Sequence, residues 1–276
     1  MKAFRGEPSI FTSARPEDRR AELQVNDLTL KFGGITALTK IELNVRNGEL
    51  VSVIGPNGAG KTSLLNCITG YYKPQEGQIL FNGQDVTRLS THHLTRLGIG
   101  RTYQNIELFP GMTVLSNMLL ARHVHCGYHV GKASLFLKSV QKEEVRHRKV
   151  LEELIDFLEM QSIRNQLVGS LPYGMRKRVE LGRALALEPK LLVLDEPFAG
   201  MTLEEKEDMV RFLVELNEAW NQTMILVEHD MSIVMSISKR VVVFDFGVKI
   251  AEGSPDFVQD HPQVIKAYLG DTSKIE

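Results

Sequence analysis

The sequence predicts an α/β protein with a mostly parallel β-sheet and an inserted helical subdomain. Four short apolar runs have the length and continuity of strands covered on both faces. A helical pattern over Leu203–Ala219 separates two of these runs, and a strand, helix, strand order is typical of parallel sheets. The four predicted strands are Leu50–Ile54, Leu191–Leu194, Met224–Val227 and Val241–Phe244.

The composition excludes several classes of protein. Of the 276 residues, 43% are hydrophobic and 24% are charged, which excludes a wholly disordered chain. No apolar run approaches the roughly 18 residues of a membrane span, and Met1–Glu22 lacks the apolar segment of a secretory signal. The net charge of -1 gives no basic field for nucleic acid, and two cysteines make no disulfide framework. We therefore expect a soluble cytoplasmic protein without a nucleic-acid partner.

The chain divides into one large domain with short ends. Residues 1–22 mix both charges without periodicity, so we expect a flexible extension. Alternating apolar residues begin at Leu23, and we place the domain at 23–270, with a tail at 271–276. The helical subdomain is expected at about residues 105–175.

The clearest helical pattern in that subdomain runs from Lys142 to Met160. Its apolar residues recur at the spacing of one helix face, which predicts an amphipathic helix packed on its own core. The predicted buried stripe consists of Val145, Leu151, Leu154, Ile155 and Leu158.

A phosphate-binding loop follows the first apolar run. Gly55–Thr62 matches the pattern G-x-x-x-x-G-K-[ST] in full, with a strand before it and a helix-forming run after it. Glycines let backbone N–H groups converge on phosphate oxygens, and the helix N-terminus adds positive potential. Lys61 supplies a charge for the β- and γ-phosphates, and the Thr62 hydroxyl is a candidate Mg²⁺ ligand. The sequence therefore predicts a nucleoside-triphosphate site with Gly55, Asn57, Gly58, Gly60, Lys61, Thr62 and Ser63.

Two acidic residues end the second apolar run. Asp195 closes a buried-strand pattern, which places its carboxylate near Mg²⁺ held by the loop. Glu196 follows, where it is able to polarise a water in line with the γ-phosphate. Asp195 is thus predicted to bind the nucleotide and its metal ion, and Glu196 to act as the catalytic base.

With these two elements, the chain resembles the ATP-binding subunits of ABC transporters. Phe32 in Lys31-Phe32-Gly33-Gly34 is similar to the aromatic residue that stacks on adenine in that family. Gln104 is similar to the glutamine that senses Mg²⁺ and the attacking water, and His229 to the histidine that contacts the γ-phosphate. Leu171–Met175 occupies the position of the signature motif, with Gly174 as its expected nucleotide contact. The resemblance implies a P-loop NTPase core with an N-terminal antiparallel β part and ATP hydrolysis as the activity.

Finer motifs resemble the family that takes up branched-chain and other hydrophobic amino acids. They include Arg101-Thr102-Tyr103-Gln104-Asn105, the ending Asp245-Phe246-Gly247, and the tail His261–Gly270. Close relatives that energise uptake of urea or small organic acids stay open as alternatives, as does lipid or lipopolysaccharide export.

Two departures from the family pattern concern the signature motif and the loop after Glu196. Pro172 and Met175 replace the usual serine and glutamine, and proline has neither hydroxyl nor backbone N–H for a phosphate contact. Thr202 stands where the loop often ends in Asp or Asn, which puts a hydrogen bond across the dimer in doubt.

The family resemblance also implies partners. Two such subunits sandwich two ATP molecules, each between the phosphate loop of one subunit and the signature motif of the other. The second ATP-binding subunit is expected to be a different chain. Two transmembrane permease subunits and, indirectly, a periplasmic or extracellular solute-binding protein complete the assembly. The chain would then sit peripherally at the cytoplasmic side of the inner or plasma membrane.

Three other interpretations remain. A soluble ABC ATPase acting on ribosomes or DNA typically has two cassettes or long coiled coils, and this chain shows one phosphate loop and no basic excess. A non-hydrolysing regulatory module is disfavoured by Lys61, Asp195, Glu196 and His229. A zinc or copper site is conceivable in the histidine and cysteine cluster formed by His123, His125, Cys126 and His129.

Overall fold

The computed structural model describes residues 20–125 and 138–269. Its centre is a six-stranded sheet with the order β10-β9-β3-β8-β7-β6, in which all neighbours are parallel except β10 and β9. The predicted parallel sheet and its four strands are confirmed. The strands are β3 (Leu50–Ile54), β6 (Ile99–Arg101), β7 (Leu191–Asp195), β8 (Thr223–Val227), β9 (Arg240–Asp245) and β10 (Val248–Gly253).

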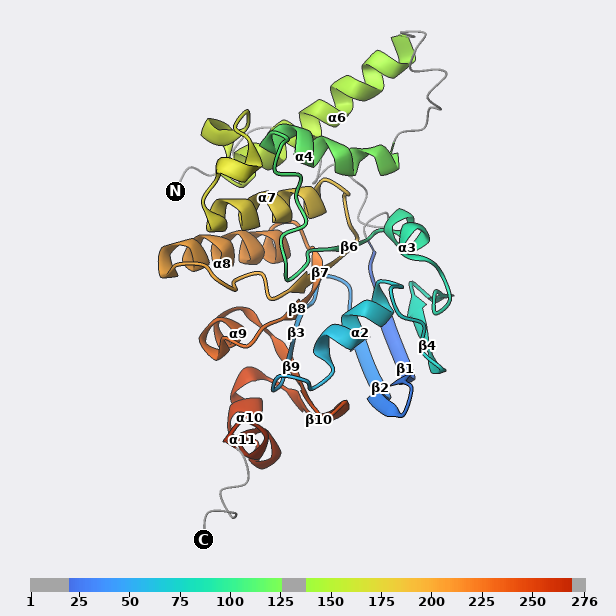
Figure 1. The fold of residues 1–276 in the computed structure, drawn as a ribbon. Helices are drawn as coiled ribbons and strands as arrows, with labels where there is room; N and C mark the ends of the chain where they lie inside the picture. Colours follow the sequence, from blue (N-terminus) through green and yellow to red (C-terminus); the bar gives the residue numbers. More distant parts are fainter. Residues whose placement is uncertain (1–19, 126–137, 270–276) are drawn as a thin grey trace.

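The continuous apolar runs arise because this sheet is covered on both faces. Along β7, Leu192 and Leu194 face one hydrophobic core, whereas Leu191 and Val193 face another. Successive side chains of a strand point to opposite faces, so a strand with two dry faces needs no polar alternation. Figure 1 shows α7 and α8 on one side of these strands, and α2 with the second sheet on the other.

The second sheet is antiparallel and has four strands in the order β2-β1-β4-β5, which confirms the expected N-terminal antiparallel part. β1 begins at Leu23, but Ala21 before it is already buried, and its N–H donates to Asn47 Oδ1 at 2.9 Å; residues 1–19 of the predicted flexible extension lie outside the described residues. The Thr39 N–H donates to the Gly247 carbonyl (2.8 Å), which links the two sheets next to the phosphate-binding loop. The strands are β1 (Leu23–Phe32), β2 (Ile35–Val45), β4 (Glu76–Phe81) and β5 (Gln84–Asp85).

Helices complete the layers and the inserted subdomain. The helix predicted between two strands is α8, which begins at Leu203 and ends one residue earlier than predicted. In the described part of the chain, no helix has both the length and the apolar character needed to cross a bilayer. The α-helices are α2 (Lys61–Ile68), α3 (Thr91–Leu97), α4 (Val114–Ala121), α6 (Lys138–Phe157), α7 (Tyr173–Leu185), α8 (Leu203–Glu218), α9 (Met231–Ile237), α10 (Pro255–Gln259) and α11 (Pro262–Leu269).

The predicted stripe of the subdomain helix is correct except at its first residue. Leu151, Leu154 and Ile155 of α6 are buried against α4, α7 and α8, and Leu158 is buried just beyond the helix end. Val145 is 69% exposed, so its assignment to the stripe was wrong. Figure 1 shows the reason: the N-terminal half of α6 projects past its neighbours, and apolar spacing alone does not reveal where the packing partner ends.

The difference in burial between Leu154 and Val145 on the same helix provides a stability test with a matched control. Leu154→Ala should lower the free energy of unfolding by about 2–5 kcal/mol, because it opens a cavity in a fully buried cluster. Val145→Ala on the same helix should change it by at most about 0.5 kcal/mol. Urea unfolding followed by circular dichroism measures both, and equal shifts of the two midpoints would contradict the packing described here.

Candidate functional site

The phosphate-binding loop connects β3 to α2 at the carboxyl edge of the parallel sheet. Gly60, the residue before α2, has φ of 100°, and a Cβ there would lie 2.8 Å from the Ala37 carbonyl oxygen. Gly55 has φ of 149°, and its Cβ would meet the Phe244 carbonyl oxygen at 2.1 Å. Both positions therefore require glycine, because the neighbouring backbone leaves no room for a side chain.

Lys61 is held inside this loop. Its Nζ donates to the carbonyl oxygens of Gly55 (2.7 Å) and Pro56 (3.0 Å), and the residue is 6% exposed. Burial lowers the pKa of Lys61, while the charges of Glu196 and Asp195 act to raise it. The loop thus positions a cation among backbone groups, with carboxylates nearby to balance its charge.

Asp195 ends β7 and is almost fully buried. Its Oδ2 forms an ion pair with Arg101 at 2.8 Å, and the two side chains are 2% and 8% exposed. Among the described residues, its Oδ1 has no hydrogen-bond partner. A buried carboxylate oxygen without a partner is costly unless a ligand satisfies it.

Glu196 follows Asp195 in a left-handed backbone conformation. Its φ is 46°, and its N–H donates to the Val227 carbonyl of β8 at 2.9 Å. A non-glycine residue in this region is strained, and such strain often lies at functional sites. The conformation turns the chain sharply after the strand.

The two other predicted catalytic residues gather around the Glu196 carboxylate. The Nε2 of Gln104 donates to its Oε2 at 2.8 Å. The Nδ1 of His229 lies 4.0 Å from the same oxygen, and the histidine side chain is 59% exposed. The structure therefore brings together Glu196, Gln104 and His229, which come from three separate segments of the sequence.

Glu228 belongs to this cluster and was missed by the sequence reasoning. It is 1% exposed, and its Oε2 accepts the backbone N–H groups of His229 (2.8 Å) and Asp230 (3.2 Å). Its Oε1 accepts the N–H of Phe198 at 3.3 Å, so the carboxylate connects the segments after β7 and β8. The available signal was an acid directly after an apolar run, the same signal that identified Asp195.

A hollow opens between the phosphate-binding loop, the start of β2, Gln104 and Glu196. Ile35, Ala37, Phe246 and Gly247 contribute its other walls. Asp195 does not line the hollow itself; it directly precedes Glu196, which does. The predicted site residues that line it are Asn57, Gly58, Gly60, Lys61, Thr62, Ser63, Gln104 and Glu196.

Phe32 and Gly174 do not line this hollow. Phe32 is 44% exposed near the end of β1, and its ring packs edge-to-face on Tyr72 with centroids 4.9 Å apart. Gly174 is buried in the first turn of α7, and Figure 1 shows that α7 lies well apart from α2. Within one chain, the signature motif and the phosphate-binding loop therefore do not meet.

The signature motif begins a helix and contacts α8. Pro172 is the N-cap of α7, and a Cβ on Gly174 would lie 2.1 Å from Oε1 of Glu205. Thr202 caps α8: its hydroxyl accepts the Glu205 N–H, and the Glu205 carboxylate accepts the Thr202 N–H. This capping box holds an acidic side chain directly against Gly174.

The candidate metal ligands suit Mg²⁺. Thr62 and Gln104 line the hollow, and the neighbouring Asp195 has a buried oxygen without a hydrogen-bond partner among the described residues. Mg²⁺ takes oxygen ligands and is commonly held by few protein groups together with substrate phosphates. The residues present therefore fit this ion.

The histidine and cysteine cluster gives no metal site in the described residues, where no group of three His, Cys, Asp or Glu side chains is suitably placed. His123 Nδ1 lies 2.8 Å from the Leu120 carbonyl, and His125 Nε2 lies 2.9 Å from the Leu187 carbonyl. Cys126 and His129 fall outside the described residues.

Comparisons with known proteins agree with this geometry. The family described as ABC transporter matches residues 38–199, and the family described as branched-chain amino acid ATP-binding cassette transporter matches residues 248–273. The high-affinity branched-chain amino acid transport ATP-binding protein BraF of Pseudomonas aeruginosa is 38% identical, over 91% of this chain and 99% of its own length.

Solved structures give the same result for the fold. A nucleotide-free ATP-binding cassette from an ABC transporter superposes with a TM-score of 0.79 at 32% identity, covering 91% of this chain and 100% of the other. A dimeric cassette in a post-hydrolysis state, bound to ADP and Pi, superposes with a TM-score of 0.71 at 27% identity. The match covers 84% of this chain and 98% of the other.

The first test of the site concerns Lys61. Lys61→Ala should weaken nucleoside-triphosphate binding by about 10- to 100-fold, because it removes charged hydrogen bonds to phosphate. Titration with a fluorescent ATP analogue measures the affinity, with exposed Lys239→Ala as control. Unchanged binding by Lys61→Ala would refute its phosphate role.

Proposed function

This chain belongs to the ABC transporter family, and we propose that it is the ATP-hydrolysing subunit of an importer for branched-chain and other hydrophobic amino acids. The observation that carries the proposal is that Lys61, Gln104 and Glu196 line one hollow, with His229 at 4.0 Å from the Glu196 carboxylate. The match of residues 248–273 to the branched-chain family and the similarity to BraF support the substrate class. They favour amino acids over urea, organic acids or lipids.

Each residue of the cluster has a proposed role in hydrolysis. Lys61 binds the β- and γ-phosphates, and the glycine backbone of the loop surrounds them. Glu196 accepts a proton from the attacking water, Gln104 orients that water through its hydrogen bond to Glu196, and His229 contacts the γ-phosphate. Mg²⁺, held by Thr62, Gln104 and Asp195, would neutralise charge on the phosphates. Phe32 is proposed to stack on adenine.

The separation of α7 from the loop supports a dimeric arrangement. Gly174 does not line the hollow formed by the phosphate-binding loop of its own chain, so a second cassette would supply the signature contact. The dimeric cassette structure bound to ADP and Pi gives a precedent for such pairing.

We propose further that the second cassette is a different chain. Pro172 offers no hydroxyl or N–H to a phosphate, and the Glu205 carboxylate lies against Gly174, where a negative charge would repel one. The site completed by this signature would therefore bind nucleotide differently from the site completed by the partner.

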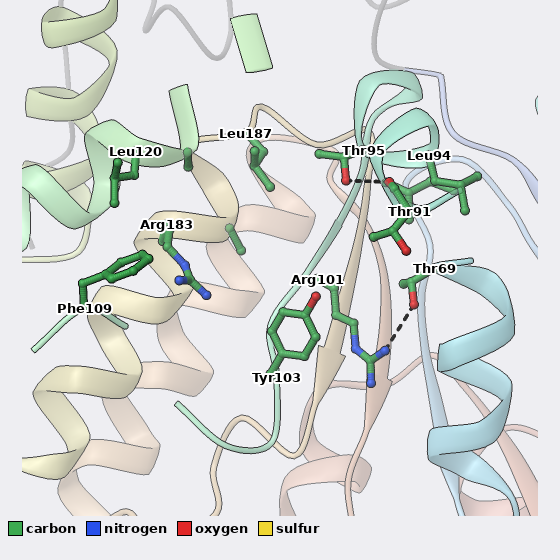
Figure 2. Close-up of a pocket in the computed structure, with 13 residues that line it drawn as sticks. Thr69, Thr91, Leu94, Thr95, Arg101, Tyr103, Phe109, Leu120, Arg183 and Leu187 are labelled. Carbon is green, nitrogen blue, oxygen red and sulfur yellow. Dashed lines mark hydrogen bonds between the residues drawn. The ribbon is translucent and has the colours of Figure 1, made fainter. Parts of the chain in front are cut away.

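A second hollow is the proposed contact with a permease subunit. It lies between α3, β6, α4 and α7, and Figure 2 shows Phe109, Leu120 and Leu187 on one side of it and Arg101 with Tyr103 on the other. Phe109 is 54% exposed and Leu120 is 41% exposed, so apolar surface is available to a partner. A permease bound there would keep this chain peripheral at the cytoplasmic face of the membrane.

Glu196→Gln tests the proposed reaction. The amide keeps the size of the side chain but cannot accept the proton, so steady-state ATP hydrolysis should fall by about 10²- to 10⁴-fold. ATP binding should persist, as titration with a fluorescent ATP analogue measures. Glu204→Gln, an exposed change in the first turn of α8, is the control. Retained turnover by Glu196→Gln would remove it as the base.

Co-purification tests the proposed partners. The tagged chain, isolated from its native membranes in mild detergent, should bring two permease subunits and a second, distinct cassette. Leu120→Glu should lower the permease yield several-fold, because it buries a charge in an apolar contact, whereas Val145→Glu on the exposed side of α6 should not. A complex with this chain as the only cassette, active and symmetric, would contradict the heterodimer.

A further inference from the structure

Arg101 is the last residue of β6, and its side chain makes contacts that connect other elements of the site. β6 pairs in parallel with β7, so that Arg101 lies beside Val193, two residues before Asp195. The side chain is 8% exposed, and a guanidinium buried to this degree needs several partners. Its partners identify what it does.

The guanidinium contacts two elements of the site at once. Its Nη2 donates to Oδ2 of Asp195 at 2.8 Å. Its Nη1 donates to Oδ1 of Asn66 at 2.6 Å and to Oγ1 of Thr69 at 3.1 Å, both near the C-terminal end of α2. Figure 2 shows the contact with Thr69 and the ring of Tyr103 beside the arginine, whose Cζ is 5.1 Å from the ring centroid.

These contacts connect the three segments that carry the candidate magnesium ligands. Thr62 lies in the first turn of α2, Asp195 ends β7, and Gln104 follows Arg101 by three residues in the same chain segment. One planar side chain with fixed donor directions therefore cross-links α2, β7 and the segment after β6.

The contact also determines which oxygen of Asp195 is available. Arg101 engages Oδ2, whereas Oδ1 has no partner among the described residues. A carboxylate that is hydrogen-bonded through one oxygen presents the other in a defined direction, which is how outer-shell partners orient metal ligands.

We propose that Arg101 is a positioning residue for Mg²⁺: it holds Asp195 through Oδ2 and fixes α2 and β7 at the separation that the metal site requires. This proposal rests on the proposed function, because it assumes that the hollow binds MgATP. Arg101 itself does not touch the nucleotide or the ion. Its effect is therefore on metal binding, with little effect on metal-free nucleotide binding.

The experiment compares nucleotide affinity with and without the metal. A fluorescent ATP analogue is titrated into the full-length chain in Mg²⁺ and in EDTA, and the ratio of the two dissociation constants gives the Mg²⁺ enhancement. Arg101→Gln should reduce this enhancement by about 10-fold or more, with the affinity in EDTA unchanged. The Mg²⁺ enhancement of Arg101→Lys should lie between those of the wild type and Arg101→Gln, since an ammonium keeps the charge but lacks the fork that bridges Asp195 and α2.

Arg96→Gln on the exposed face of α3 is the matched control and should keep the full enhancement. An unchanged enhancement in both Arg101 variants would overturn the proposal, and a larger one would do so by showing that the guanidinium competes with the cation. If Arg101→Gln does not fold, Arg101→Lys decides alone. Failure of the wild-type chain to bind the analogue at all would instead refute the proposed function.

Discussion

Parallel pairing of β6, β7, β8 and β3 is the constraint on which the site depends. Parallel strands end at the same edge of a sheet, so residues that follow these four strands meet although the sequence separates them widely. The phosphate-binding loop follows β3, Gln104 follows β6, Glu196 follows β7 and His229 follows β8. A register shift of one residue in any of these strands would move the site residue that follows it by about 3 Å along the strand direction.

The same edge of the sheet carries several charged side chains, and most of them have a counter-charge or hydrogen-bond donors beside them. Arg101 neutralises one oxygen of Asp195, and Glu228 is satisfied by three backbone N–H groups. Two groups remain for a ligand: the Oδ1 of Asp195, which has no hydrogen-bond partner among the described residues, and the Nζ of Lys61, which is bonded only to loop carbonyls. An anionic ligand that carries its own cation complements both, since it satisfies a buried acid and a buried base together.

Much of the fold and the site was predictable, because the decisive signals are local. Leu191–Asp195 has two dry faces, and this shows directly as a continuous apolar run ending in an acid. The phosphate-binding loop is likewise encoded in consecutive residues. Val145, Arg101 and Glu205 illustrate what was not predictable. Their environments are set by elements far away in the sequence. The exposure of Val145 depends on where α4 and α7 end beside α6, Arg101 contacts the end of α2, and Glu205 contacts the first turn of α7.

The contact of Glu205 with Gly174 connects the two segments in which the sequence departs from the family pattern. Thr202 retains the capping function that Asp or Asn would provide, and its capping box fixes the Glu205 side chain. That carboxylate lies at the N-terminal turn of α7, where the helix dipole favours a negative charge. Pro172 leaves this turn without a side-chain cap of its own, so the acid from α8 supplies the charge. A phosphate bound by a second cassette would have to share this turn with Glu205, and their repulsion is the physical reason behind the proposal of two unequal nucleotide sites.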